Sequence, residues 1–133
     1  MEEIEFYLPW PPSVNNYYSH ARYGVYVNKK GKAYRLAVAE SVAEQACRLS
    51  IDFPMNLEVV LHPPDKRRRD LDNYMKSLLD AMTEADVWED DSLIDQLGVY
   101  RGRVVKSGSV VIRINEAGPI LPHPLEGSSP GYD

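Results

Sequence analysis

Four consecutive cations that run into two aspartates form the part of this sequence whose residue types could do chemistry. The cations are Lys66, Arg67, Arg68 and Arg69. Asp70 follows at once, and Asp72 lies two residues further on. Cations hold phosphate oxygens, and paired carboxylates hold a divalent ion that polarises such an oxygen. The segment therefore predicts a metal-dependent enzyme that acts on a polyanion.

A purely structural role for the same aspartates stays open. Pro63 and Pro64 should end a strand, and a helix should follow over about 71–85, so Asp70 or Asp72 could cap its N-terminus. Lys76 and Asp80 follow Asp72 at intervals of four, which is the spacing of a surface ion ladder on one helical face. Capping does not explain the cation block, because cations are unfavourable at the positive end of a helix dipole.

A second acidic group could complete a metal site. Metals that prefer oxygen ligands need more than two carboxylates or must keep several waters. Asp90 and Asp91 precede a predicted strand and could add a carboxylate to the pair, giving a cluster for one or two Mg²⁺ or Mn²⁺ ions that activate water. Lys76 could then neutralise a phosphate oxygen or assist the nucleophile. Taken alone, an acidic loop is usually only solvated surface.

The elements that must position these residues form one small domain. Strands are predicted at 4–8, 24–27, 57–61, 92–101 and 109–115, and helices at about 33–49 and 71–85. Residues 9–18 are predicted to be a loop rich in Asn and Tyr. The order predicts an α+β fold of mixed α/β layers over 1–116, a small mixed sheet with two main helices packed on it. Residues 117–133 carry four prolines and are predicted to be a flexible tail.

Composition and charge narrow the class of protein. The chain of 133 residues has no apolar run long enough for a membrane span and begins unlike a signal peptide. Cys47 is its single cysteine, which suits a reducing cytoplasm. Although the net charge is -5, no acidic residue lies between Phe6 and Ala39. The positive charge there comes from Arg22, Lys29, Lys30, Lys32 and Arg35. Two separate basic segments favour a large polyanion over a small phosphate ester.

Two long segments resemble the RusA family of Holliday-junction resolvases. The run KRRRDLDNYMKSLLDAMTEADVW at 66–88, with Asp90 and Asp91 after it, is similar to the central motif of that family. LPWPPSVNNYY at 8–18 is similar to its N-terminal signature. The resemblance implies a small, homodimeric, Mg²⁺-dependent endonuclease, often encoded by prophages, that acts in DNA recombination and repair. It implies that Asp70, Asp72 and Asp91 bind metal, with Asp90 beside them, and that Lys76 is essential.

The resemblance and the charges together predict a DNA-binding surface. Its candidate residues are Lys66, Arg67, Arg68, Arg69, Asn15, Asn16, Tyr17, Tyr18, Arg22, Lys29, Lys30 and Arg35. Tyrosines at 17, 18, 23 and 26 could stack on unpaired bases at a junction crossover, or could simply pack over the sheet edge.

A homodimer and branched DNA are the expected partners, and no membrane or small-molecule cofactor is expected. A four-way junction has approximate two-fold symmetry, so an isologous dimer could place one site on each of two strands. Two alternatives stay open. One is a non-catalytic junction-binding accessory protein, and the other is a nuclease that prefers flaps or forks.

Overall fold

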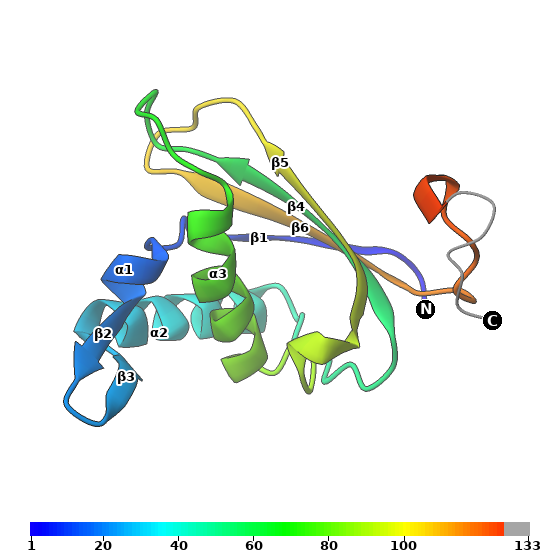
Figure 1. The fold of residues 1–133 in the computed structure, drawn as a ribbon, viewed down its shortest axis with the longest axis horizontal. Helices are drawn as coiled ribbons and strands as arrows, with labels where there is room; N and C mark the ends of the chain where they lie inside the picture. Colours follow the sequence, from blue (N-terminus) through cyan, green and yellow to red (C-terminus); the bar gives the residue numbers. More distant parts are fainter. Residues whose placement is uncertain (127–133) are drawn as a thin grey trace.

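The structure, a computed structural model, describes residues 1–126. A four-stranded sheet and two long helices make up most of it, and a separate hairpin projects from one side (Figure 1). The elements in chain order are β1 (Ile4–Leu8), α1 (Val14–Tyr17), β2 (Tyr18–Ala21), β3 (Gly24–Val27), α2 (Lys29–Glu44), β4 (Met55–His62), α3 (Asp72–Glu84), the 3₁₀ turn η1 (Asp91–Leu93), β5 (Ile94–Arg101), β6 (Ser109–Glu116) and the 3₁₀ turn η2 (Pro124–Glu126).

The large sheet is mixed, which confirms the predicted fold class. Its strand order is β1-β6-β4-β5, and only β4 and β5 run parallel. Parallel neighbours need a crossover, and α3 lies between these two strands in the chain. The carboxyl ends of β4 and β5 therefore meet at the same edge of the sheet.

One face of the sheet is buried beneath α2 and α3. Alternation along β4 turns Leu57, Val59 and Leu61 into this core, and Ile112 of β6 lies in the same layer. Helix α3 contributes Leu78, which is fully buried. Burying a side chain of this size contributes about 1.5 to 3 kcal/mol, so the core fixes the position of α3 on the sheet.

Helix α2 begins before the predicted residue 33, because Asn28 caps it. The Asn28 side chain accepts a hydrogen bond from the Gly31 N–H at 2.9 Å, which satisfies an unpaired donor of the first turn. Gly31 is required for packing here. A Cβ at this position would lie 2.5 Å from the Tyr17 carbonyl oxygen and 2.6 Å from a Val27 methyl.

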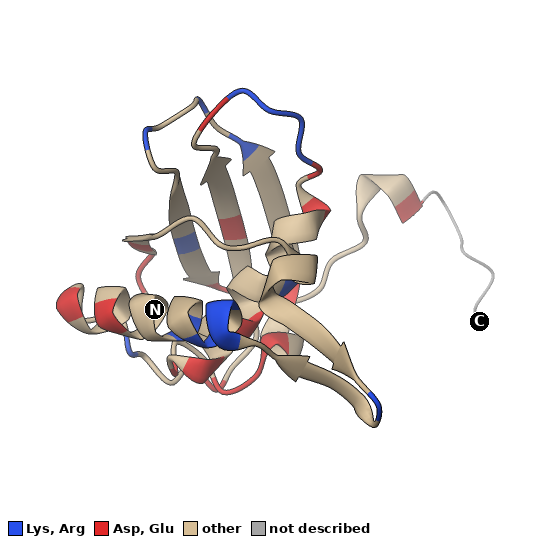
Figure 2. Cartoon of the chain, turned by 90° about the vertical axis from the view of Figure 1, so that its left-hand side faces the viewer, with Lys and Arg blue, Asp and Glu red and all other residues tan. Residues whose placement is uncertain are grey.

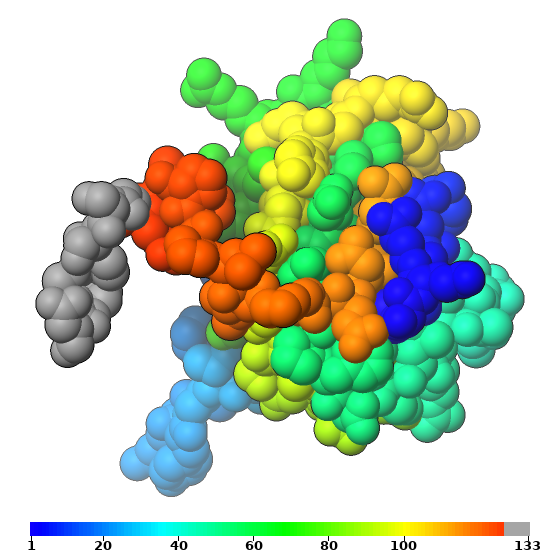
Figure 3. All heavy atoms as spheres, turned by 90° about the vertical axis from the view of Figure 1, so that its right-hand side faces the viewer, coloured from blue at the N-terminus to red at the C-terminus, as the bar shows by residue number. Residues whose placement is uncertain are grey.

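The region predicted as the Asn- and Tyr-rich loop contains α1 and the start of β2, neither of which the sequence pattern indicated. Strands β2 and β3 form a two-stranded antiparallel hairpin that is not part of the large sheet. It stands clear of the body of the molecule (Figure 3).

The described part of the predicted tail, 117–126, runs along the surface and includes η2. The rest of that predicted tail lies outside the described residues. No helix within 1–126 is long and apolar enough to cross a membrane.

Candidate active site and nucleic-acid interface

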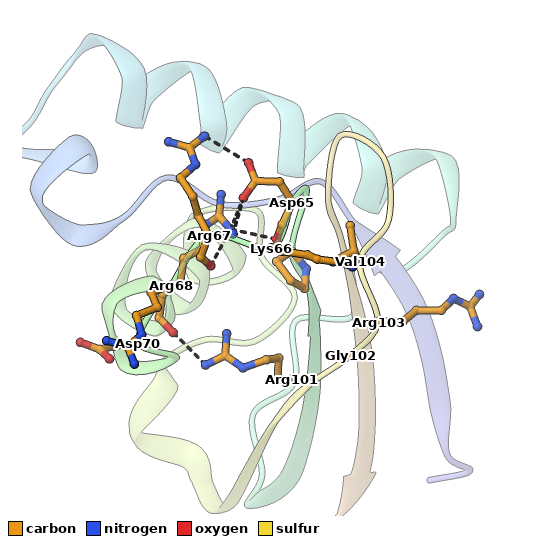
Figure 4. A pocket seen from close by; sticks show the side chains of 11 residues that line it. Asp65, Lys66, Arg67, Arg68, Asp70, Arg101, Gly102, Arg103 and Val104 are labelled. Carbon is orange, nitrogen blue, oxygen red and sulfur yellow. Dashed lines mark hydrogen bonds and ion pairs between the residues drawn. The ribbon is translucent and has the colours of Figure 1, made fainter.

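A basic pocket of about 650 Å³ opens at the carboxyl ends of the parallel strands β4 and β5 (Figure 4). Open α/β sheets commonly bind ligands at this edge. The loop after β4 lines one side of the pocket with the predicted cation block and with Asp70. The last residue of β5, Arg101, and Arg103 in the segment after it line the other side, and the sequence analysis did not single them out. No local sequence pattern points to these two arginines, because the parallel pairing of β5 with β4 is what places them there.

Hydrogen bonds hold the cation loop in one shape. Asp65 accepts from the Arg67 backbone N–H at 2.9 Å and forms an ion pair of 2.8 Å with Arg69. Bonding from Arg69, and then from Arg67, holds the pKa of the Asp65 carboxyl well below its usual range. From β5, Arg101 Nη2 donates to the Arg69 carbonyl oxygen at 2.8 Å, next to Asp70.

The four predicted phosphate ligands are therefore not equivalent. The Arg69 side chain is only 11% exposed, and its guanidinium lies 5.8 Å from the centre of the Trp10 ring, so it helps to hold the loop. Lys66, Arg67 and Arg68 are exposed at the rim of the pocket. Arg67 is also ion-paired with Asp65 at 3.1 Å, whereas no ion pair involves Lys66 or Arg68 within 1–126.

The aspartates at the start of α3 do not cap it. The N-cap position is Leu71, in a helical conformation and without a side-chain hydrogen bond, so the capping interpretation is wrong. Asp70 and Asp72 are both exposed. Within 1–126, neither carboxylate is paired with a cation or hydrogen-bonded to another side chain. Two uncompensated carboxylates beside a basic pocket leave oxygen ligands available.

A second pocket, of about 450 Å³, lies along α3. Lys76 and Asp80 line it from the helix, and Asp90 and Asp91 line it from the following turn. The Asp90 carboxylate accepts from the Ser92 N–H at 2.8 Å, a bond that lowers its pKa. Tyr18 covers Lys76, whose Nζ lies 4.8 Å from the ring centre.

Trp88 anchors the loop that carries Asp90 and Asp91. Its side chain is fully buried, and the indole N–H donates to Thr83 Oγ1 at 2.7 Å. The next residue, Glu89, donates its backbone N–H to the Ile51 carbonyl oxygen at 2.9 Å. The backbone is therefore held in place directly before Asp90 and Asp91.

Asp80 is occupied by a network that joins three elements. Arg35 of α2 donates to Asp80 Oδ2 from Nε at 2.9 Å and lies within 2.8 Å of it through Nη2. The Tyr17 hydroxyl donates to the same oxygen and accepts from Arg35 Nε at 2.9 Å. Burial, and then the hydrogen bond to Asp80, raises the pKa of the Tyr17 hydroxyl. The network fixes α1 and α2 against α3.

Comparison with known proteins agrees with these features. The model of one family, Endodeoxyribonuclease RusA, matches residues 9–115. The protein named crossover junction endodeoxyribonuclease RusA from Escherichia coli (strain K12) is 38% identical over 118 residues, covering 89% of this chain and 98% of the relative. Relatives of the same name from Enterobacteria phage 82 and from Shigella sonnei (strain Ss046) are 37% and 36% identical with the same coverage. The chain belongs to the RusA endodeoxyribonuclease family. The predicted resemblance is confirmed.

The structure contradicts one of the DNA contacts predicted for this RusA-family chain. Tyr17 is fully buried and bonded to Asp80, so its ring cannot stack on a base. Tyr18 and Tyr17 are neighbours in the chain, but Tyr18 is only partly buried and faces Lys76. Arg35, which is half-buried, is paired with Asp80.

The other predicted DNA contacts of the N-terminal region lie on the surface. The exposed residues are Asn15, Asn16, Arg22, Lys29 and Lys30. Lysines at the start of α2 appear as a basic group near the hairpin in Figure 2. Their binding to DNA stays a prediction.

The three aspartates predicted to hold a metal do not gather within one chain. Asp70 lines the basic pocket, whereas Asp91 lines the second pocket. Lys76, one turn and about 6 Å of helix rise beyond Asp72, belongs to the second pocket as well. In the described residues, no group of three or more His, Cys, Asp or Glu side chains is placed to hold a metal ion. The oxygen donors fit a hard divalent ion, but one chain does not bring three together.

Proposed function

We propose that this protein is a Mg²⁺-dependent endonuclease that resolves Holliday junctions by paired, symmetric cleavage of DNA in recombination and repair. The observation that carries the proposal is the basic pocket at the carboxyl ends of β4 and β5, which Asp70 borders directly. Cations that hold a phosphodiester lie beside free carboxylates that can hold its activating ion. The names of the RusA relatives, crossover junction endodeoxyribonucleases, support the choice of a four-way junction as substrate.

Each charged group has a role in this reaction. Arg68, Arg101 and Arg103 hold backbone phosphates and position the strand. Asp70 and Asp72 supply metal ligands, completed by Asp91 and its neighbour Asp90. Mg²⁺, or Mn²⁺ in its place, supplies a Lewis acid and an activated water when bound.

Lys76 supplies a positive charge that stabilises the negative charge developing on the phosphate. It lies on α3 four residues beyond Asp72, on the same helical face. Its ammonium group would neutralise a non-bridging oxygen as negative charge builds up in the transition state.

We further propose that the protein acts as a homodimer in the cytoplasm, and that the metal site needs both copies. The support for a shared site is that Asp70 and Asp91 line different pockets of one chain. An isologous pair would let the Asp91 of one copy approach the Asp70 of the other, and would give two equivalent sites. Two sites related by a two-fold axis match two incisions across a four-way junction.

The test is incubation of the purified protein with an immobile four-way junction, with Mg²⁺ or with a chelator. We expect paired nicks at symmetric positions, only when Mg²⁺ is present. The Asp70→Asn and Asp72→Asn variants should not cleave but should still bind the junction, because the carboxylates hold metal and do not recognise shape. Full cleavage by either variant would overturn the assignment of the site.

Parallel reactions with flap, fork and linear duplex substrates separate the alternatives. Stronger cleavage of flaps or forks would favour a different branched substrate. Junction binding without cleavage in any metal would favour an accessory protein.

A further inference from the structure

The β2–β3 hairpin carries large side chains that are exposed to solvent and therefore do not contribute to the core of the fold. Tyr23 at its tip is 91% exposed, and Tyr26 on β3 is 51% exposed. Gly24 follows the tip with φ +140°, a backbone conformation that side-chain-bearing residues rarely adopt, and this allows the sharp turn. An exposed tyrosine at a narrow projecting tip is available to a partner.

The root of the hairpin is held firmly, so the tip is presented in a defined direction. Tyr18 and Val27, paired at the root, pack against the core. Asn28 donates its backbone N–H to the Tyr17 carbonyl oxygen at 3.0 Å and its side-chain N–H to Ser19 Oγ at 3.0 Å. An isolated two-stranded hairpin is only marginally stable, and these contacts supply the missing support.

The positive charge around the hairpin favours binding of a polyanion. No acidic residue occurs between Phe6 and Ala39. The Arg22 guanidinium lies 5.6 Å from the centre of the Tyr23 ring, so the tip combines a cation with an aromatic face. Lys29 and Lys30 are exposed where the hairpin meets α2. Aromatic rings interleaved with cations are the combination that binds unpaired nucleotides.

The hairpin also begins at the candidate active site. Tyr18 at its root faces Lys76, and the tip lies roughly 15 Å further along the strand direction. A strand cut at the site would therefore pass the hairpin several nucleotides away, which lets the tip reach the branch point where the four arms of a junction meet.

We propose that the hairpin is a wedge that opens the junction crossover, with Tyr23 stacked on an unpaired base and Arg22 on the adjacent phosphate. Tyr26 supports the same strand from the side of the hairpin. This inference rests on the proposed junction-cleaving function and adds the element that recognises the branch point.

The experiment uses the full chain without divalent ions and an immobile junction that carries 2-aminopurine beside the crossover. Binding of the unaltered protein should change the 2-aminopurine fluorescence, because the base leaves its stack. Tyr23→Ala should remove most of that change and weaken junction binding about fivefold or more, while binding to a linear duplex of equal length stays within twofold. Tyr23→Phe should behave as the unaltered protein.

Tyr100→Ala is the matched control, since Tyr100 on β5 is 54% exposed and lies far from the hairpin in the chain. It should leave both binding and fluorescence unchanged. Equal fluorescence and junction affinity for Tyr23→Ala and the unaltered protein would overturn the wedge.

Sedimentation of the same variants distinguishes an interface between protein copies. Loss of the dimer on Tyr23→Ala would show that the hairpin holds a second copy and would overturn the wedge. Cleavage of the junction by the unaltered protein is measured separately with Mg²⁺. If cleavage is normal and the wedge fails, the proposed function stands; if no junction is bound or cut, both fail.

Discussion

The Lys76 ammonium nitrogen lies 4.8 Å from the centre of the Tyr18 ring, and the two side chains line the same pocket. The acidic residue one turn along, Asp80, does not pair with Lys76, because Arg35 and Tyr17 occupy its carboxylate. The aromatic face thus orients the lysine without neutralising it. A free but directed ammonium group is what a phosphate-binding lysine needs.

Loss of this ring should slow cleavage modestly. A cation–π contact at a partly exposed site contributes about 0.5 to 1 kcal/mol. Tyr18→Leu should therefore reduce the single-turnover rate of junction cleavage about two- to fivefold, with junction affinity retained. Tyr18→Phe, which keeps the aromatic face, should cleave at the original rate. A Tyr18→Leu rate equal to that of the unaltered protein would contradict the role.

The network around Asp80 should contribute to stability. Tyr17→Phe removes a hydrogen bond to a charged carboxylate, an interaction that contributes about 1.5 to 3 kcal/mol. We expect a loss of this size in the free energy of unfolding, measured by urea denaturation at pH 7. Tyr7→Phe is the control, because Tyr7 is exposed on β1 and its hydroxyl takes no part in the network; its stability should not change.

The same network should make the free energy of unfolding fall at high pH. Burial, and then Asp80, raises the pKa of Tyr17 above the value near 10 that a tyrosine has in an unfolded chain. The folded state therefore retains a proton that the unfolded state loses. This stabilisation is complete below about pH 10 and declines as the pH rises further. Urea denaturation between pH 8 and 11 should show a shallower decline for Tyr17→Phe; equal slopes would contradict the shift.

Salt dependence should separate the cations that bind phosphate from those that hold the fold. Each phosphate contact adds about 0.9 to the slope of log affinity against log salt. Arg68→Ala and Arg103→Ala should each flatten the slope for junction binding by about that amount. Arg48→Ala is the control, because Arg48 is exposed but paired with Asp86 and lines neither site pocket. An unchanged slope for Arg68→Ala would rule out a backbone contact there.

Mixing two inactive variants should reveal a shared metal site. If Asp70 of one copy works with Asp91 of the other, a mixed dimer of Asp70→Asn and Asp91→Asn has one site with both changes and one site intact. Refolding equal amounts of the two variants together should make about half of the dimers mixed, and each mixed dimer should nick one strand, so about a quarter of the normal number of sites is intact. If each site lies within one copy, every site carries one change and the mixture stays inactive.

The sequence alone predicted the parts of this protein that depend on local pattern. Alternating apolar residues indicated β1, β4 and β6, and helical spacing indicated α3, because side-chain periodicity follows directly from backbone geometry. The charge run ending at Asp70 could be singled out as a candidate site, since its residues are neighbours in the chain, and the structure places them around one pocket. The short α1 and strand β2 were missed, because four-residue elements are too short to show a period.

Only the tertiary structure decided which distant residues share a site. Parallel pairing of β4 with β5 brings Arg101 and Arg103 to the cation loop, across more than thirty positions of sequence. The turn from α1 into β2 buries Tyr17 and leaves Tyr18 over Lys76. Two identical residues in a row give no sequence signal that distinguishes the fully buried one from the partly buried one. Asp70 and Asp91 line different pockets of the one chain, which their order in the sequence does not reveal. Strand pairing and helix packing bring together residues that are far apart in the chain. Short sequence patterns do not show which distant residues become neighbours.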